Sequence, residues 1–430
     1  MDRSTYSPAL QAKITFAGTN HTSYAQAEEA LQALAELEVS DKQTRRVCKA
    51  IGAERVAERD AEVAAYQQLP LTERKGVPAG VTPPAVAVTG VDGGRLQSFE
   101  RAASAAAAEP EVIEDDLLTL EEVAETTAKK SHWREDKIGL LLTMTSAVQT
   151  VDPCPEIPAS FVDPTWIPEL ARELNRRGPP KGAVDKPATD PPGVAAATSE
   201  SATPQWQPPA VQTKHLVGTR RPWDAFGPMV AAKAHALGFY GAARRAFLGD
   251  GAETNWTLWR NHFSSFVPIL DFIHGLTYVF HAALAGRAFD VGWQTYEQWI
   301  RWVWVGEVEL VIAALAQRQA ELGVPTADAK ATSPAKLVAK ALGYLQRNKD
   351  RMRYAEYRRQ GLPIVSSYVE SAVKQFNYRV KGTEKFWREA GAEQILQLRA
   401  DYASDGDAMS AFWERRQARE TGQARYRRAA

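Results

Sequence analysis

The segment at residues 85–94 has the sequence AVAVTGVDGG, and it decides the fold class of this 430-residue chain. Its first five residues are small or β-branched, which is typical of a buried strand. The segment ends at Asp92, and the glycines that follow allow a sharp turn and leave room for a ligand. Residues 95–97 could form the returning arm of a hairpin. Because ligands bind at the carboxyl ends of strands in α/β sheets, the segment predicts an α/β fold with a site near Asp92.

Three further strands are expected, at residues 138–145, 246–248 and 266–271. The strand at 246–248 runs into the tripeptide GDG around Asp250. Its end resembles that of the strand at 85–91, which runs into Asp92 and two glycines. Taken alone, each Asp-Gly pair also fits an ordinary turn. Two aspartates on adjacent strands could instead share metal ions, and carboxylate oxygens suit Mg²⁺ or Mn²⁺. A pair of such ions, about 3.5–4 Å apart, supports in-line phosphoryl transfer.

Charge and cysteine content narrow the class of protein. The chain has 52 Lys and Arg against 52 Asp and Glu, so its net charge says nothing about partners, but residues 340–388 and 413–428 are basic. A basic C-terminal third is compatible with a nucleic-acid-binding face. Two cysteines are too few for a disulfide framework or a four-thiolate zinc site. No segment has the pattern of a signal peptide or a membrane helix, so we expect a soluble cytoplasmic protein with reduced thiols.

The first 67 residues are expected to be mainly helical. Capping-box patterns at residues 23–26 and 40–43 each begin a helix, and the second, basic helix is expected to stop at Gly52. Two short helices with a tight break suggest a helix-turn-helix, although a solvated helical hairpin fits the same pattern. In the DNA-binding case the contacts would come from Lys42, Arg45 and Arg46.

Two segments interrupt the regular patterns of the chain. Residues 68–83 are rich in proline and glycine and predict a linker, and residues 178–214 predict a mobile loop or a second linker. Helices are expected at residues 223–240, 276–356, 367–379 and 386–402. The 276–356 stretch contains four tryptophans, which we expect in a core, although wedges between base pairs are the alternative.

Two segments near the C-terminus carry a family resemblance. Residues 361–375 have the sequence GLPIVSSYVESAVKQ, and residues 387–400 have the sequence WREAGAEQILQLRA. Together they are similar to the two-part signature around the catalytic glutamate of bacterial insertion-sequence transposases of the ISKra type, with the ISLre type nearby. The resemblance covers roughly residues 84–400 and implies a DDE enzyme with an RNase H-like fold, related to Mutator-like transposases. It makes Glu370 the catalytic glutamate, where the alternative is a surface glutamate near a helix start.

The family pattern also points to the other site residues. Its first aspartate is followed by Gly-Gly-Arg, which matches Asp92, and its second ends a later strand before a tryptophan, which matches Asp250 and Trp256. A Cys/Asp-x-x-His motif of related enzymes matches Asp271 and His274, which would support the site. Asp271 also ends a strand and is the rival for the second aspartate, while His274 could instead cap or pack a helix.

The resemblance implies a division of the chain into six parts. These are an N-terminal helical region (1–67), a linker (68–83), the first part of an RNase H-like core (84–275), an all-helical insertion (276–356), the glutamate helix with the end of the core (357–402) and a basic tail (403–430). Residues 98–215 are long for this place in the family and would form an insertion of their own.

Basic residues flank Glu370 on both sides in the sequence. Such a cluster would neutralise phosphates, and the tyrosines interleaved with it could stack on unpaired bases. A charge run is also typical of a solvated helix face, but its place beside a catalytic glutamate favours DNA contact. The expected contacts in this region are Arg358, Arg359, Lys374, Arg379 and Lys381.

The sequence therefore predicts a bacterial transposase that uses Mg²⁺ or Mn²⁺, held by Asp92, Asp250 and Glu370, to cleave and join insertion-sequence ends. Its partners would be double-stranded DNA at the terminal inverted repeats, target DNA and further copies of the chain, at the nucleoid. The alternatives are a transposase descendant that binds DNA without cutting it, and an RNase H-like nuclease without strand transfer. Many family members carry a cysteine-rich zinc module near the N-terminus, and this sequence has none.

Overall fold

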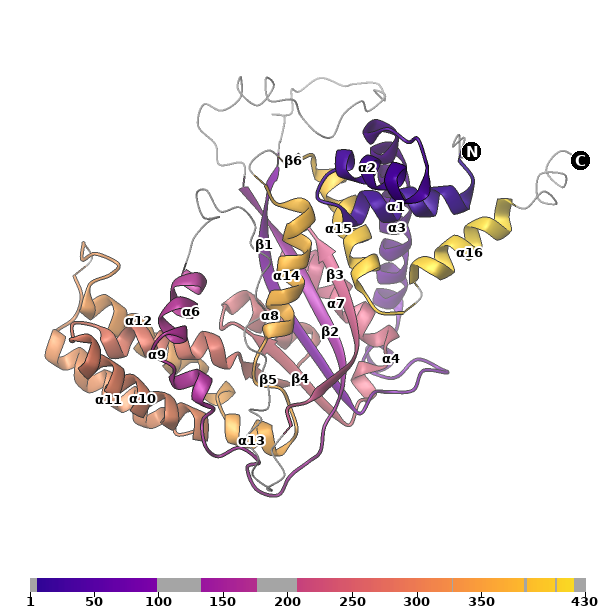
Figure 1. Cartoon of the computed structure of the whole chain (residues 1–430). Coiled ribbons are helices and arrows are strands. Elements are labelled where there is room, and N and C mark those ends of the chain that lie inside the picture. Colours follow the sequence, from indigo (N-terminus) through magenta and orange to yellow (C-terminus); the bar gives the residue numbers. More distant parts are fainter. Residues whose placement is uncertain are drawn as a thin grey trace, which may run out of the picture.

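The computed structural model describes residues 6–98, 133–175, 207–326, 328–382, 385–406 and 408–420. Within them the chain is a mixed α/β protein built on one central sheet (Figure 1). The strands are β1 (Val86–Ser98), β2 (Trp133–Thr145), β3 (Ala210–Thr219), β4 (Arg244–Gly249), β5 (Val267–Leu270) and β6 (Phe386–Trp387). The predicted α/β class is confirmed, and so are the strands expected at 138–145, 246–248 and 266–271.

The helices account for most of the remaining described residues. Those before β5 are α1 (Pro8–Asn20), α2 (Tyr24–Ala35), α3 (Asp41–Gln68), α4 (Leu71–Arg74), α6 (Trp166–Asn175), α7 (Trp223–Ala236) and α8 (Glu253–His262). Those after β5 are α9 (Phe272–Leu284), α10 (Phe289–Val305), α11 (Val308–Leu322), α12 (Pro334–Asn348), α13 (Tyr354–Arg359), α14 (Ser367–Val380), α15 (Glu389–Ala403) and α16 (Ala408–Glu420). None of the helices in the described ranges is long and apolar enough to cross a membrane.

The sheet has the strand order β3-β2-β1-β4-β5. Strand β2 is antiparallel to both of its neighbours, whereas β4 and β5 run parallel to β1. Strand β4 pairs with β1 only along residues 86–90, and β6 pairs with it only at residues 97–98. Among the described residues, the edge of β1 between these two pairings therefore carries no neighbouring strand on the β4 side.

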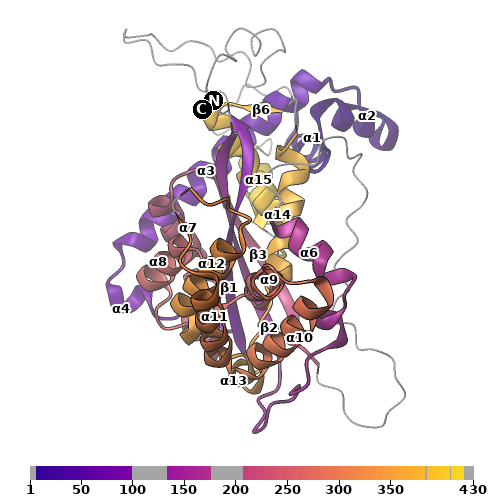
Figure 2. The same cartoon turned by 90° about the vertical axis from the view of Figure 1, so that its left-hand side faces the viewer.

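Helices cover both faces of the sheet, and two glycines mark where they come closest. A Cβ atom on Gly90 of β1 would lie 2.5 Å from Val369 of α14, and one on Gly139 of β2 would lie 2.8 Å from Val230 of α7. Gly139 pairs with Val91, the neighbour of Gly90, so the two glycines face opposite sides of the sheet. Helices α14 and α7 consequently lie on opposite faces (Figure 2).

Strand β1 is longer than the sequence pattern predicts. It continues without a break through Asp92 to Ser98, so residues 95–97 are not a returning hairpin arm. Gly94 does not form a turn. It leaves room for the Asp136 carboxylate on β2, which would lie 2.7 Å from a Cβ atom at this position. The expected loop at 178–214 is also wrong at its end, since residues 210–214 belong to β3. Its residues 178–206 lie outside the described part, as do residues 99–132.

The N-terminal helices begin where the sequence predicts, but they do not end there. Ser23 and Ser40 cap α2 and α3, and Ser40 forms the full capping box with Gln43. Helix α3 then runs through Gly52 to Gln68. The prediction that this helix stops at Gly52, as the short second helix of a helix-turn-helix, is therefore wrong. A Cβ atom on Gly52 would lie 2.8 Å from Gln394 of α15, which shows that the glycine permits close helix packing.

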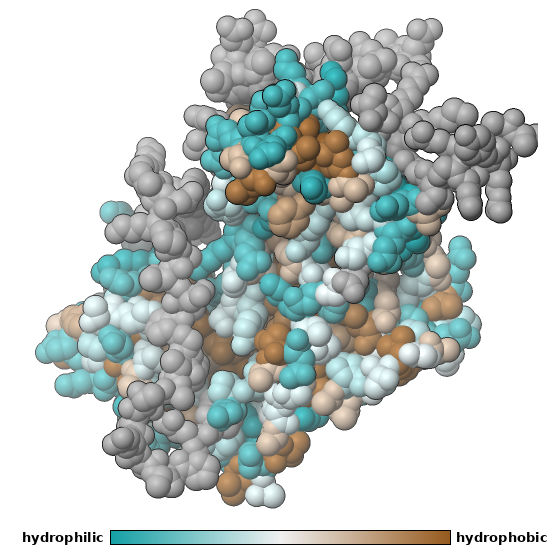
Figure 3. Space-filling model, turned by 45° about the vertical axis from the view of Figure 1, so that its right-hand side comes forward, coloured by the Kyte–Doolittle hydropathy of each residue, from teal (hydrophilic) through white to brown (hydrophobic). Residues whose placement is uncertain are grey.

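The N-terminal and C-terminal helices share a small hydrophobic core of their own. Ile14 and Leu31 are buried in it together with Leu398 of α15 and Phe412 of α16. Helices α1, α2 and α3 accordingly lie beside α15 and α16 at one end of the molecule (Figure 1). On the face that carries these helices, hydrophilic and hydrophobic residues are interspersed (Figure 3).

The stretch predicted as all helix at 276–356 is confirmed as helical, in α9 to α13 with short connections. Its aromatic residues are mainly part of the core. Trp299 and Trp304 are buried, as expected, and so are Tyr344, Tyr354 and Tyr357. These three tyrosines are therefore not available to stack on DNA bases, which corrects the expectation for them.

Candidate functional site

Three acidic residues from distant parts of the chain come together beside the open edge of β1. Asp92 lies on β1, Asp250 directly follows β4, and Glu370 lies in the first turn of α14. Burial raises the pKa of Asp92 to about 7, and the negative charges of Asp250 and Glu370 contribute to this rise. The charges of Asp250 and Glu370 thus act on the Asp92 carboxylate, and Asp92 and Asp250 line the same cleft.

Asp250 is oriented by the segment that follows it. Its Oδ1 accepts hydrogen bonds from the backbone N–H of Ala252 at 2.9 Å and from Nδ2 of buried Asn255 at 2.7 Å. Its backbone carbonyl accepts a hydrogen bond from the Tyr344 hydroxyl of α12 at 2.7 Å. The backbone turns at Gly251, whose φ of +93° favours glycine. The helices after β5 therefore help to position a residue at the end of β4.

Asp271 and His274 form a second group next to these carboxylates. Asp271 is fully buried at the start of α9, where it accepts hydrogen bonds from the Ile273 N–H at 2.8 Å and from the Ser366 hydroxyl. Nδ1 of His274 lies 3.2 Å from Oδ2 of Asp271, the oxygen that also accepts from Ser366. Burial disfavours a charge on His274, but Asp271, with help from Asp250, outweighs it and raises the pKa of His274 to about 9. A positive charge on His274 would offset part of the negative charge of the surrounding carboxylates.

Glu370 of α14 lies close to Asp271 and His274. One ligand atom each from Asp271, His274 and Glu370 lie within 4.8 Å of one another. Burial raises the pKa of Glu370, and the charge of Asp271 raises it further, while His274 and Lys374 oppose this shift. Its Oε1 is buried and has no hydrogen-bond partner among the residues that the structure describes. Because buried polar atoms are normally paired, this oxygen is suited to bind a cation.

Asp92 and Asp250 line a cleft of about 460 Å³, whereas Glu370 and Asp271 are not among its lining residues. One wall is the open edge of β1, and the other is the start of α8. Trp223 of α7 and Glu135 of β2 lie at the side of the cleft. The residues that line it are Asp92, Gly93, Gly94, Arg95, Glu135, Trp223, Asp250, Ala252, Thr254 and Asn255. An oxygen-rich metal site would thus open onto a space large enough for part of a substrate.

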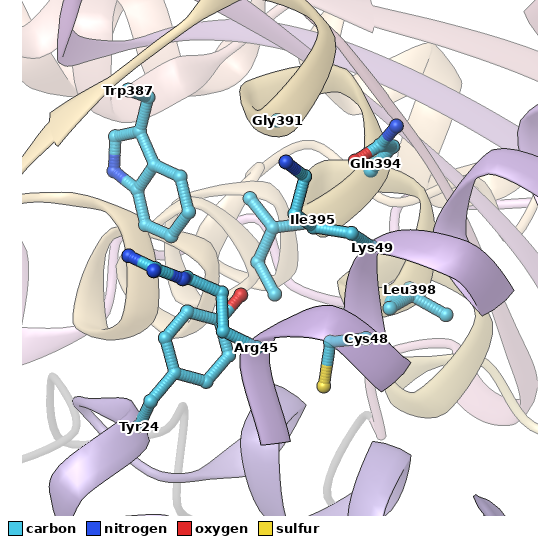
Figure 4. Close-up of a pocket in the computed structure, with 9 residues that line it drawn as sticks. All are labelled: Tyr24, Arg45, Cys48, Lys49, Trp387, Gly391, Gln394, Ile395 and Leu398. Carbon is cyan, nitrogen blue, oxygen red and sulfur yellow. The ribbon is translucent and has the colours of Figure 1, made fainter. Parts of the chain in front are cut away.

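The predicted DNA contacts separate into exposed and buried residues. Lys42, Arg46, Arg359 and Lys374 are exposed, and Arg45 and Lys381 are partly buried. Arg45 lines a pocket of about 10 Å³ between α3 and α15, with room for about one water molecule (Figure 4). This pocket is too small to hold a substrate.

Arg358 and Arg379 are only 1% and 2% exposed. Arg358 pairs with Asp152, and Arg379 donates from Nε to the Gly18 carbonyl at 3.0 Å. Arg379 also lies over the Tyr24 ring, 4.4 Å from its centroid. We therefore assign both arginines to the protein interior instead of to a DNA-contacting surface, which corrects the sequence-based expectation.

Several residues that shape the site carry no sequence signal that could have revealed them. Asn255 and Tyr344 both donate hydrogen bonds to Asp250, but they lie 5 and 94 residues away from it in the sequence. Ser366, in the loop before α14, donates to Asp271, which is 95 residues away. Asp136 is paired with Gly94 and lies on the same face of the sheet as Asp92. Its two carboxylate oxygens are buried, and within the described ranges neither has a hydrogen-bond partner.

Asp136→Asn is expected to stabilise the protein at alkaline pH. Burial raises the pKa of Asp136 from 3.8 to about 6, although Lys137 and Lys381 oppose this shift. The folded state therefore holds a proton that the unfolded chain releases, and the free energy of unfolding falls as the pH rises through about 6. At about 1.4 kcal/mol per pKa unit, the variant should gain roughly 2–3 kcal/mol over the wild type at pH 8 and almost nothing at pH 4. Urea unfolding at both pH values measures this difference.

Asp350→Asn is the matched control, because Asp350 is exposed. It should change stability little at either pH. A loss of stability in Asp136→Asn at pH 8 would mean that the ionised carboxylate has a stabilising partner, and the expectation would fail.

Neither a scan against protein-family models nor a search of curated proteins finds a match to this chain.

Proposed function

We propose that this chain is a DDE-type DNA transposase that cleaves and joins DNA ends with Mg²⁺ or Mn²⁺. The observation that carries the proposal is the convergence of Asp92, Asp250 and Glu370 at one edge of the sheet, with the like-charge effect on the pKa of Asp92. Glu370 Oε1 is buried without a hydrogen-bond partner among the described residues, and a cation would stabilise the ionised form of the carboxylates. Oxygen ligands favour hard divalent ions. Such a site suits phosphoryl transfer.

The topology supports an RNase H-like catalytic domain. The order β3-β2-β1-β4-β5, with only β2 antiparallel, agrees with the fold that the family resemblance implies. The helices α9 to α13 separate β5 from α14, as expected for an all-helical insertion before the glutamate helix. Tyr344 of this insertion bonds to the backbone of Asp250, so the insertion would also stabilise the site.

Asp250 is a better candidate than Asp271 for the second aspartate. Asp250 lines the cleft, where it could reach both a metal ion and a phosphate. Asp271 is fully buried, and its oxygens already contact Ile273, His274 and Ser366. In the proposed enzyme Asp271 keeps His274 protonated and in place, and His274 balances the charge of the carboxylates.

The proposed chemistry divides between the metal and the chain. Bound Mg²⁺ or Mn²⁺ would activate the attacking oxygen and stabilise the leaving oxygen of the phosphodiester. The chain itself orients Asp250 through Asn255 and Tyr344 and presents Glu370 from α14. Exposed cations such as Lys374, one turn after Glu370, would hold neighbouring phosphates.

The test is a cleavage assay with the full chain, Mg²⁺ or Mn²⁺, and labelled DNA carrying the sequences that flank its gene. Cleavage followed by joining to a second DNA, lost in Asp92→Ala and in EDTA, is the expected result. Nicking without joining would favour an RNase H-like nuclease. Binding without any cleavage would favour a transposase descendant that only recognises DNA.

A further inference from the structure

The cleft beside the carboxylates has the size of a site for a small organic molecule. Its volume of about 460 Å³ lies within the range of roughly 300–1,000 Å³ that such sites occupy. A metal ion and its water shell would fill only part of it, since a water molecule takes about 30 Å³. The remaining space therefore fits a single nucleotide.

Trp223 offers this cleft a fixed aromatic surface. Its indole Nε1 donates to Glu135 at 3.2 Å, and its ring packs edge-on against Phe226 at 5.5 Å between centroids. The Lys137 ammonium lies 5.6 Å from the centroid of the same ring. Trp223 is only partly buried, and it lines the cleft. A tryptophan that is held in place but open to a polar cleft is suited to stack on a nucleobase, since every base has an aromatic face.

Arg95 supplies the positive charge that a nucleotide also needs. It is exposed at the edge of the cleft, three residues after Asp92 on β1. Among the residues that the structure describes, no ion pair engages Arg95, in contrast to Lys137, which pairs with Glu135 at 3.2 Å. Glu135 also lines this side of the cleft, and it forms an ion pair with Lys137. Arg95 is thus free to bind a phosphate in an otherwise acidic place.

We infer that this cleft binds one unpaired nucleotide of the DNA end, with its base against Trp223 and a phosphate at Arg95. The inference rests on the proposed function, because the nucleotide next to the one held here would be presented to Asp92 and Asp250. A base must leave the duplex to enter, which costs a few kcal/mol and is least costly at a frayed or mismatched end. Stacking on Trp223 offsets this cost.

The test uses a single-stranded oligothymidine with one central 2-aminopurine, bound to the full chain without divalent metal. Wild type should quench the 2-aminopurine, and Trp223→Ala should bind about tenfold more weakly or worse and lose the quenching. Trp223→Phe should keep part of the affinity, since it keeps a ring. Trp166→Ala is the matched control, because Trp166 of α6 is partly buried and lies outside the cleft.

A cleavage assay gives the second readout. Trp223→Ala should cleave paired end DNA poorly and should recover on DNA whose terminal bases are already unpaired. Equal oligonucleotide binding by wild type and Trp223→Ala would overturn the inference, even where end cleavage proceeds. If the wild type does not cleave end DNA but binds the oligonucleotide through Trp223, the proposed function is overturned. The nucleotide site is then still supported.

Discussion

Glu370→Gln is expected to lower metal-dependent cleavage of DNA ends by about a thousandfold or more, without lowering the stability of the fold. Glutamine keeps the shape of the side chain but removes the negative charge that would bind the metal. Because the bound metal would stabilise the charge that develops in the transition state, weaker metal binding lowers the cleavage rate. Burial raises the pKa of Glu370, so its ionised form is unfavourable in the metal-free protein. The variant should therefore unfold at the same temperature as the wild type, or higher.

Two measurements separate this role from a structural one. Single-turnover cleavage reports the loss of activity, and thermal unfolding with and without Mn²⁺ reports metal binding, because a ligand that binds only the folded state raises the unfolding temperature. Manganese should stabilise the wild type and should stabilise Glu370→Gln much less. The matched control is Glu173→Gln, which removes an exposed carboxylate whose charge also raises the pKa of Glu370.

Glu173→Gln should cleave DNA nearly as well as the wild type, since Glu173 is exposed on α6 and does not line the cleft that contains Asp92 and Asp250. Similar losses in both variants would indicate a general effect of negative charge near α14. Activity of Glu370→Gln within tenfold of the wild type would remove Glu370 from the proposed metal site, and with it the geometric basis of the triad.

Local signals in the sequence were enough to predict several elements, and they singled out Asp92 and Asp250 as candidates at strand ends. Ser40 and Gln43 satisfy a capping box within three residues, and the short apolar run of residues 246–248 before Asp250 suffices to predict a buried strand. Both patterns depend on neighbours in the chain, so they can be read without the fold. Glu370 came from the family resemblance, and its burial in α14 beside Asp271 is visible only in the structure.

Features that depend on distant neighbours could not be predicted in this way. Gly93 and Gly94 look like a turn, but β1 continues because β2 pairs with it along its whole length. The glycine at 94 makes room for Asp136, and Gly52 makes room for α15 in the same manner. A glycine has the same letter in a turn and in a close contact, so only the packing partner distinguishes the two.

Adjacent charges of the same kind can also have opposite roles. Arg358 and Arg359 stand side by side in a basic run, yet only Arg359 is exposed. Arg358 is the buried one because α13 turns it toward Trp304, whose carbonyl accepts a hydrogen bond from Nη2 at 3.0 Å. The sequence shows the charge of each residue but not the direction in which the helix presents it.

Arg358→Ala is expected to destabilise the protein by about 3–5 kcal/mol, the usual cost of removing one partner of a buried ion pair. Arg358 Nε donates to Asp152 at 2.9 Å, and its guanidinium lies 4.0 Å from the centroid of the Trp304 ring. Removing this side chain leaves the Asp152 carboxylate and the Trp304 carbonyl without that donor and opens a cavity beside the ring. Urea unfolding, or the unfolding temperature of the metal-free chain, measures the loss.

The neighbouring Arg359→Ala provides the contrast, because it removes the same charge from the same helix at an exposed position. Its stability should stay within about 0.5 kcal/mol of the wild type, whereas its affinity for DNA should fall and lose part of its salt dependence. An Arg358→Ala variant that is as stable as Arg359→Ala and weaker in DNA binding would return Arg358 to the DNA-contacting surface. That result would require α13 to rotate, since Arg358 cannot reach both Asp152 and a phosphate at the protein surface from one helix orientation.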